Sequence, residues 1–298
     1  MKSTEEYYNT ALNLRNRADY VQPNDLQSLL QKPTFSGFVS ASVGPSLSFE
    51  MFICEGDDLV AARLFWRGHF EPMSSQLWAK LCKGANVACD IGSHSGYYSL
   101  LANQANPNLI VWSFEPHPIV YSRLLINIRA NKLSANHCIN KAIVADKNPT
   151  ASLYVNSAHW AITSGSSLLQ RAGYKINVAT QFIGTLVSQN QERPTLIKID
   201  VEGIEEELIN ALAFCGYGSV SDILTEQLEP WSQQTNSTLT TAGWTILEID
   251  ESAMSITNTF GRGRQDSSGE SRNIWLTRRD EASISEIVSS FQQVYERP

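Results

Sequence analysis

The chain has 298 residues, of which 42% are apolar and 18% are charged, with 17 Gly and 11 Pro. This composition excludes the disordered, collagen-like and coiled-coil classes and predicts a globular protein long enough to bury a core. The formal net charge is −7 and no basic cluster is denser than Arg278–Arg279. We therefore expect no nucleic-acid partner and no membrane partner.

The apolar runs are short. The longest, such as Leu109–Phe114, have about six residues, whereas a membrane-spanning helix needs about 20. The first ten residues, MKSTEEYYNT, are polar and acidic, unlike a secretory signal with its basic start and apolar centre, so we expect a cytoplasmic protein. Five scattered cysteines without a CxxC spacing predict neither a disulfide framework nor a zinc site.

Residues 1–85 are predicted to form an N-terminal α+β extension, a helix plus a β-hairpin. Alternating polar and apolar residues at Ser48–Ile53 predict a strand, and Glu55–Asp58 supplies turn residues before a second apolar run, Leu59–Ala61. The spacing of apolar residues predicts a further helix over residues 74–81. We expect the extension to close a ligand pocket or to form the contact of a homodimer.

Residues 86–298 alternate short apolar runs with amphipathic segments, which predicts βαβ units and an α/β domain with a doubly wound parallel sheet. The predicted strands of its core are Val87–Cys89, Leu109–Phe114, His137–Ile139, Leu196–Ile199 and Asp222–Leu224. The predicted helices are Tyr97–Asn103, Pro118–Asn131 and Ile204–Leu212. Two later runs, Gly243–Ile249 and Asn273–Leu276, predict antiparallel terminal strands, and Ser157–Ser167 is predicted to be a loop.

The most informative segment is VACDIGSHSGYYSL, residues 87–100, which predicts a buried strand, a glycine turn and the start of a helix. Asp90 ends the strand, where ligands bind in a doubly wound sheet. Gly92 and Gly96 let the backbone approach a ligand closely, and the helix N-terminus offers free N–H groups. Taken alone, the turn is explained equally well by a tight connection. Its spacing is not GxGxxG, which argues against an NAD-dependent oxidoreductase.

A second signal is the apolar strand that ends in Glu115, 25 residues after Asp90. A carboxylate at the tip of this strand can accept two hydrogen bonds from ribose hydroxyls. The alternative is a helix cap or an ordinary turn residue. Together, the two motifs favour a nucleoside ligand.

A third signal is the strand that delivers Asp200 and Glu202 to the same sheet edge, where Gly203 opens a helix. Glu205 is assigned to the first turn of that helix, where the helix dipole favours an acid. Asp200 ends the fourth core strand and is expected to face the ligand crevice. Acids in such a position commonly serve a cation or a substrate proton.

From about Gly68 to about Thr277 these motifs resemble the FkbM-type S-adenosylmethionine-dependent methyltransferases. The resemblance rests on four segments in order: GHFEP at 68–72, DIGSHSGYYS at 90–99, FEP at 114–116 and KIDVEGIE at 198–205. One departure is Ser93-His94, where the family usually has Ala-Asn.

The resemblance implies a seven-stranded class I methyltransferase (Rossmann-like) sheet, S-adenosylmethionine as cofactor, and a small-molecule substrate. The family's usual reaction is O-methylation of a hydroxyl, as in a sugar or a secondary metabolite. Glu115 would hold the ribose, Ala142 would flank the adenine and Asp200 would lie near the transferred methyl group. The implied cofactor-binding residues are Glu71, Asp90, Gly92, Ser93, His94, Gly96, Tyr97, Glu115, Pro116, Ala142 and Asp200.

Methyl transfer depends mainly on aligning donor and acceptor, and a poorly acidic hydroxyl also needs a base. The candidates are Asp200, Glu202 and His159, although a single loop histidine is more often an ordinary one. Asp200 and Glu202 could instead hold Mg²⁺, but no third ligand is evident and we expect no metal. The alternatives are N-methylation of a small amine, or a non-catalytic scaffold of the same fold. A scaffold would be expected to lose the glycines and acids that this chain keeps.

Overall fold

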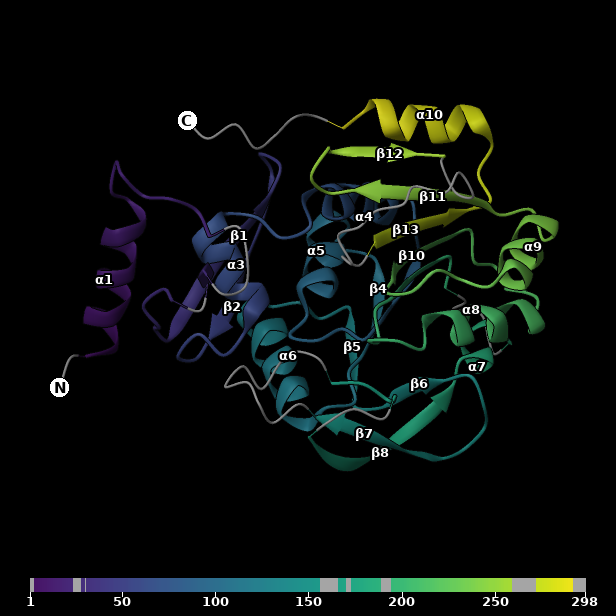
Figure 1. Ribbon diagram of the computed structural model, residues 1–298, viewed down its shortest axis with the longest axis horizontal. Helices are drawn as coiled ribbons and strands as arrows, with labels where there is room; N and C mark the ends of the chain where they lie inside the picture. The colour runs from purple at the N-terminus through teal and green to yellow at the C-terminus, as the bar shows by residue number, and fades with distance from the viewer. Residues whose placement is uncertain are drawn as a thin grey trace.

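The computed structural model describes residues 3–23, 28–29, 31–155, 166–169, 173–188, 194–258 and 272–291. Its centre is an eight-stranded sheet in the order β12-β11-β13-β10-β9-β3-β4-β5 (Figure 1). The strands are β3 (Val87–Ile91), β4 (Ile110–Phe114), β5 (Asn136–Ile139), β9 (Leu196–Ile199), β10 (Asp222–Gln227), β11 (Thr245–Asp250), β12 (Ser255–Thr257) and β13 (Arg272–Thr277). Strands β5, β4, β3, β9 and β10 pair in parallel, whereas β13, β11 and β12 extend the sheet with antiparallel pairs.

The predicted count of seven strands was wrong by one. The additional strand is β12, which follows β11 through a tight turn and pairs with it at the sheet edge. The Asp250 carboxylate accepts hydrogen bonds from the N–H groups of Ser252 and Ala253, which stabilises this turn. A strand of three residues carries too little periodicity to be seen in the sequence.

Helices cover both faces of the sheet, as predicted for a doubly wound fold. One face carries α4 (Pro72–Lys83), α5 (Tyr97–Ala105), α6 (Pro118–Ala130) and α10 (Glu281–Ser289), and the other carries α7 (Gly184–Ser188), α8 (Glu205–Phe214) and α9 (Gln233–Thr241). Successive residues of β3 alternate between the two cores: Ala88 packs with the first set and Cys89 with the second. Because both faces are buried, the strands are continuously apolar in sequence.

A separate three-stranded sheet, β6-β8-β7, is formed by β6 (Ala142–Val144), β7 (Thr150–Val155) and β8 (Tyr174–Phe182). It was not predicted, and it lies beside the main sheet near α6 and α7 (Figure 1). Most of the predicted loop Ser157–Ser167, including His159, lies outside the described residues. Among the described residues, no helix is long and apolar enough to cross a membrane.

The extension contains α1 (Thr4–Arg15), a β-hairpin of β1 (Gly37–Val43) and β2 (Leu47–Ile53), and α3 (Leu59–Arg67). The hairpin exists, but its predicted turn was wrong because the chain reverses at Gly44, with φ 63°. Asp58 instead caps α3 by accepting a hydrogen bond from the Ala61 N–H at 3.0 Å. Three apolar residues after a turn, such as Leu59–Ala61, are compatible with a strand and with a helix. The N-cap hydrogen bond of Asp58 favours the helix.

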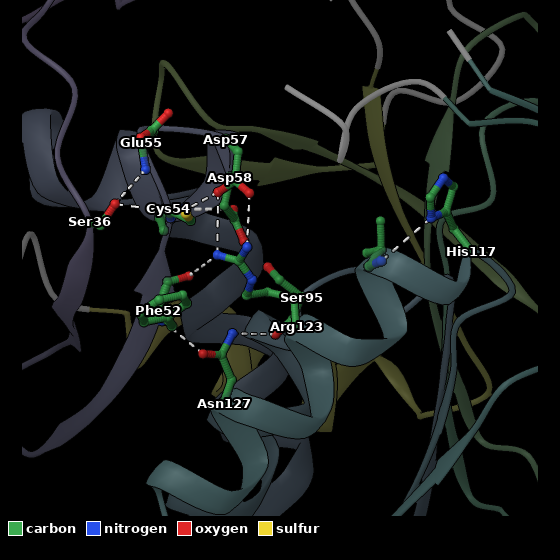
Figure 2. Close-up of polar contacts among 12 residues, drawn as sticks. Ser36, Phe52, Cys54, Glu55, Asp57, Asp58, Ser95, His117, Arg123 and Asn127 are labelled. Carbon is green, nitrogen blue, oxygen red and sulfur yellow. Dashed lines mark hydrogen bonds and ion pairs between the residues drawn. The ribbon is translucent and has the colours of Figure 1, made fainter. Parts of the chain in front are cut away.

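The open edge of β2 is covered by side chains of α6 (Figure 2). Asn127 Oδ1 accepts the Phe52 N–H at 2.7 Å, while its Nδ2 donates to the Ser95 carbonyl at 2.7 Å. Arg123 forms an ion pair with Asp57 at 2.8 Å, and both side chains are largely buried. The extension, which includes α4, also shares one hydrophobic core with α5 and α6. The boundary near residue 85 stays a prediction.

Candidate active site

A cavity of about 340 Å³ lies at the carboxyl ends of β3, β4, β9 and β10. Its lining contains every predicted cofactor-binding residue except Gly96. The extension contributes one wall through Leu59, Val60, Arg63, Phe70 and Glu71, as expected if it closes a pocket. Residues that are far apart in sequence therefore meet where a doubly wound sheet binds its ligands.

The turn after β3 is built around Gly92, whose φ is 81°. A Cβ at this position would lie 1.8 Å from the Asp200 carbonyl oxygen, so no side chain fits between the two loops. The N–H groups of Gly92 and Ser93 both donate to the Phe114 carbonyl at 2.9 Å. Gly96 begins α5 with φ 99°, and a Cβ there would lie 2.6 Å from Leu124. Gly96 therefore sets helix packing rather than lining the cavity.

Asp90 is 1% exposed and lines the cavity floor. Its carboxylate accepts a hydrogen bond from Ser99 Oγ at 2.5 Å, and Ser99 also contacts Ser113 Oγ at 2.7 Å. Burial raises the pKa of Asp90, against the lowering effects of Lys198 and Ser99. Asp90 is thus a buried acid held in place by hydroxyl groups from α5 and β4.

Glu115 follows β4 and is 7% exposed. Its two carboxylate oxygens accept backbone N–H groups, from His94 at 3.0 Å and from His117 at 2.8 Å. Burial raises the pKa of Glu115 to about 7, while His94 acts to lower it. His94 reaches this position with a left-handed φ of 52°, a conformation that the sequence prediction did not anticipate. Asn in the family and His here are both residues that tolerate this region.

Lys198 of β9 is the main cation of the site. It is 3% exposed, and its Nζ lies 2.7 Å from Asp200 Oδ2 and 4.3 Å from the centroid of the Tyr98 ring. Burial acts to lower the pKa of Lys198, but Asp200, Glu71 and Asp90 together hold it above its ordinary value. The same ion pair holds the pKa of Asp200 below its ordinary value despite burial.

Glu71 precedes α4 in a left-handed conformation, with φ 40°. Its side chain makes no cap for the helix and instead accepts a hydrogen bond from the Tyr98 hydroxyl. Burial raises the pKa of Glu71 to about 7, although Lys198 acts to lower it. A strained non-glycine residue that directs a carboxyl into a cavity is typical of a functional position.

The other two carboxylates of the third motif differ in their surroundings. Glu202 lines the cavity, and its carbonyl accepts the Ser167 hydroxyl at 2.6 Å. Glu205 accepts the Gly203 N–H at 2.9 Å and begins α8, which confirms its assignment to the first helical turn. Glu226 of β10 also lines the cavity and hydrogen-bonds the Asp200 carboxyl, which acts to lower the pKa of Asp200.

Sequence reasoning missed Lys198, Glu226, Arg63 and His117 as lining residues. A lysine inside the apolar strand LIKI was a usable signal, because a charge buried on a parallel strand must be paired. His117 caps the start of α6 and also lines the cavity. No local pattern pointed to Arg63 or Glu226.

Ala142 and Tyr97 lie where the predictions placed them, in the cavity lining. Ala142 is 3% exposed at the start of β6, and the Tyr97 hydroxyl contacts Ser75 Oγ at 2.8 Å. Ser93 Oγ donates to the Asp90 carbonyl at 2.7 Å, which ties the turn to the end of β3. Their roles toward a cofactor remain predictions.

The sequence matches the family described as "Methyltransferase FkbM domain" over residues 90–252, more than half of the chain. The protein belongs to the FkbM methyltransferase family. It is therefore an S-adenosylmethionine-dependent methyltransferase, as the motif resemblance predicted. No curated protein matches the chain in sequence.

Three solved structures similar to this FkbM-family chain share little sequence with it. Precorrin-6y C5,15-methyltransferase from Geobacter metallireducens is 12% identical over 70% of this chain and 88% of its own, with a TM-score of 0.38. The putative methyltransferase yhhF from Escherichia coli is 13% identical over 82% of this chain and 100% of its own, with a TM-score of 0.43. A SAM-dependent methyltransferase from Agrobacterium tumefaciens is 10% identical over 81% of this chain and 70% of its own, with a TM-score of 0.43.

Proposed function

We propose that this FkbM-family protein methylates a hydroxyl group of a small molecule, such as a sugar or a secondary metabolite. The observation that carries the proposal is the Glu71 carboxyl in the cavity wall, whose pKa of about 7 allows it to take up a proton near neutral pH. A hydroxyl acceptor must lose a proton as the new C–O bond forms. Tyr98 fixes one oxygen of this carboxyl by a hydrogen bond.

The residues of the cavity fit S-adenosylmethionine. Gly92 lets the turn after β3 pack directly against the Asp200 backbone, which brings two lining residues of the cavity together. Among the described residues, the Glu115 carboxylate accepts one backbone N–H on each oxygen, which leaves lone pairs for two ribose hydroxyls. Ala142 offers a small apolar surface for the adenine. When bound, the cofactor supplies a methyl group on a sulfonium that is already electrophilic.

The remaining site residues are assigned by their charge state. Asp200 is ionised and paired with Lys198, so it is a weak base and is better suited to orienting the cofactor or the acceptor. Lys198 already occupies one carboxylate oxygen of Asp200 that a divalent cation would use. Glu202 is kept as a second candidate base, and His159 lies outside the described residues. Burial of Lys198 and Asp90 beside the cavity keeps the reacting groups in a region of low dielectric, where fixed charges act strongly.

A small acceptor is favoured by the size and charge of the cavity. About 340 Å³ falls at the small end of the range for small-molecule sites. The net charge of −7 is unfavourable for a nucleic-acid or anionic-membrane partner. N-methylation of a small amine is the second candidate, because carboxylates outnumber cations in the lining and would attract an ammonium group.

The test is transfer from labelled S-adenosylmethionine to a panel of small alcohols, sugars and amines, run with the parent protein and with Glu71→Gln. We expect methylated hydroxyl products that Glu71→Gln no longer forms. Binding of S-adenosylhomocysteine is measured alongside, because Glu71 is also among the implied cofactor-binding residues and loss of a base must be separated from loss of the cofactor. The control is Glu55→Gln, the same substitution at an exposed position of the extension. Transfer to amines alone would overturn O-methylation, and full activity of Glu71→Gln would overturn the role of this carboxyl.

A further inference from the structure

His117 has an unusual position, since it caps a helix and lines the cavity at the same time. Its Nδ1 accepts the N–H groups of Ile119 at 3.2 Å and of Val120 at 3.5 Å at the start of α6. An imidazole nitrogen that accepts hydrogen bonds carries no proton, so the ring proton of the neutral form lies on Nε2. The cap therefore makes Nε2 a hydrogen-bond donor.

This donor is buried and has no partner among the described residues. The side chain is 2% exposed, and Figure 2 shows Nε2 on the side of the ring turned away from the α6 amide that Nδ1 contacts. Buried polar groups in native proteins are nearly always hydrogen-bonded, and an exception needs an explanation. A ligand in the cavity that His117 lines would supply the missing acceptor.

The neighbouring residue Glu115 indicates which part of a ligand lies here. Glu115 Oε1 accepts the His117 backbone N–H at 2.8 Å, so the carboxylate and the imidazole belong to one turn. Glu115 is an acceptor for hydroxyl groups, whereas His117 offers a donor to a ring nitrogen or an ether oxygen. A nucleoside presents both kinds of group within a few ångströms of each other.

We propose that His117 is a cofactor-binding residue that donates its Nε2–H to an acceptor atom in the nucleoside part of S-adenosylmethionine. This inference rests on the proposed cofactor site and deepens it, because neither the sequence motifs nor the family match assigns the residue. Burial also lowers the pKa of His117, which keeps the ring neutral at the pH of an assay. The donor is then present without adding a charge next to the adenosine.

A different observation carries a second inference, about Arg63 of α3. Its Nε is buried, and among the described residues its guanidinium contacts only the Phe70 ring, 5.7 Å from the centroid. Arg63 lines the cavity, whereas the buried cation there, Lys198, is already paired with Asp200. The carboxylate of the methionine part is the only anionic group of the cofactor at neutral pH. We infer that Arg63 binds this carboxylate, which gives the extension a direct part in cofactor binding.

Both inferences are tested by calorimetric titration of the full chain with two ligands. S-adenosylhomocysteine carries the nucleoside and the amino-acid part, whereas 5′-methylthioadenosine carries the nucleoside alone. The variants are His117→Asn, which keeps a favoured helix cap but lacks Nε2, and Arg63→Gln. Each has a matched control outside the cavity lining: His137→Asn at the exposed position of β5 and Arg67→Gln on α3. Melting temperatures accompany every titration.

We expect His117→Asn to weaken both ligands by the same factor, roughly tenfold. Arg63→Gln is expected to weaken S-adenosylhomocysteine by roughly 30-fold and to leave 5′-methylthioadenosine unchanged. The two controls should bind both ligands as the parent does. If His117→Asn does not fold, His117→Ser supplies another favoured cap without a ring donor.

Parent-like affinity of a folded His117 variant for both ligands would overturn the first inference and leave the proposed function intact. Unchanged binding of S-adenosylhomocysteine by Arg63→Gln, or equal weakening of both ligands, would overturn the second. A parent protein that binds neither ligand would instead overturn the cofactor site itself, and both inferences with it.

Discussion

Replacement of Lys198 by methionine is expected to destabilise the protein strongly. The side chain is 3% exposed, and its ammonium lies 2.7 Å from Asp200 while Glu71 and Asp90 also act on it. Methionine fills a similar volume, so the effect is one of charge rather than of packing. Removal of one partner of a buried ion pair costs about 3–5 kcal/mol. We expect the lower end, about 3 kcal/mol, because the Asp200 side chain is 30% exposed and water can reach it.

The loss should depend on pH with a definite sign. In the parent, the pKa of Asp200 lies below its ordinary value of 3.8, so its stabilising effect is present above that value and is lost as the pH falls. Without Lys198, burial is the largest remaining influence on Asp200 and Asp90 and raises the pKa of both. A group with a raised pKa loses its contribution as the pH rises through the folded value. The variant should therefore be most destabilised at alkaline pH.

The assay is urea unfolding followed by circular dichroism near pH 8 and near pH 5.5, with midpoints and m-values compared for parent and variant. The double variant Lys198→Met, Asp200→Asn is the control, since it removes both charges and should recover part of the lost stability. A single variant as stable as the parent would refute the reasoning. A deficit that is the same at both pH values would refute the electrostatic part of it.

Three further predictions concern single residues. Gly92→Ala should lower the free energy of unfolding by about 2 kcal/mol or more, measured by thermal unfolding. The new Cβ would lie 1.8 Å from the Asp200 carbonyl oxygen, and the φ of Gly92, 81°, is unfavourable for alanine. An unchanged melting temperature would contradict this prediction. The pKa of about 7 at Glu115 predicts that affinity for S-adenosylhomocysteine rises from pH 6 to pH 8, since the ionised carboxylate is the better acceptor. Glu115→Gln should bind roughly tenfold more weakly at pH 8, with a flat pH profile by calorimetry. Asp222→Ala should lower the free energy of unfolding in urea by about 3 kcal/mol, because Asp222 is 1% exposed and accepts the Trp275 indole N–H at 3.0 Å. A decrease below about 1 kcal/mol would be too small for the loss of a buried acceptor and would contradict this prediction.

The parallel core of the sheet could be predicted because each of its strands is a short apolar run bounded by turn residues. Val87–Ile91 and Leu196–Ile199 are buried on both faces, and this burial produces the continuous apolar pattern. The acids after the strands were predicted to meet because the carboxyl ends of parallel strands share one edge. Asp90, Glu115 and Asp200 do line one cavity.

What escaped prediction depends on contacts between distant segments. Arg63 enters the cavity through the packing of α3 on the hairpin, and nothing in its own neighbourhood encodes that packing. Leu59–Ala61 is compatible with strand and helix alike, and only the Asp58 cap separates the two. His117 lies between two prolines, and this local pattern is enough to predict that it caps a helix. That its Nε2 is left without a hydrogen-bond partner depends on the folded structure around it.

The cavity also has a consequence for how the chain folds. Its floor is formed where β3 pairs with β9, and the first hydrogen bond of that pairing joins Thr195 to Val87, 108 residues apart. Such long-range pairing is slow to form because a large loop must close first. A ligand that needs this floor can bind only the completed fold. At 100 times its dissociation constant, such a ligand would add about 2.7 kcal/mol to global stability, so resistance of the whole chain to proteolysis would report cofactor binding without any knowledge of the methyl acceptor.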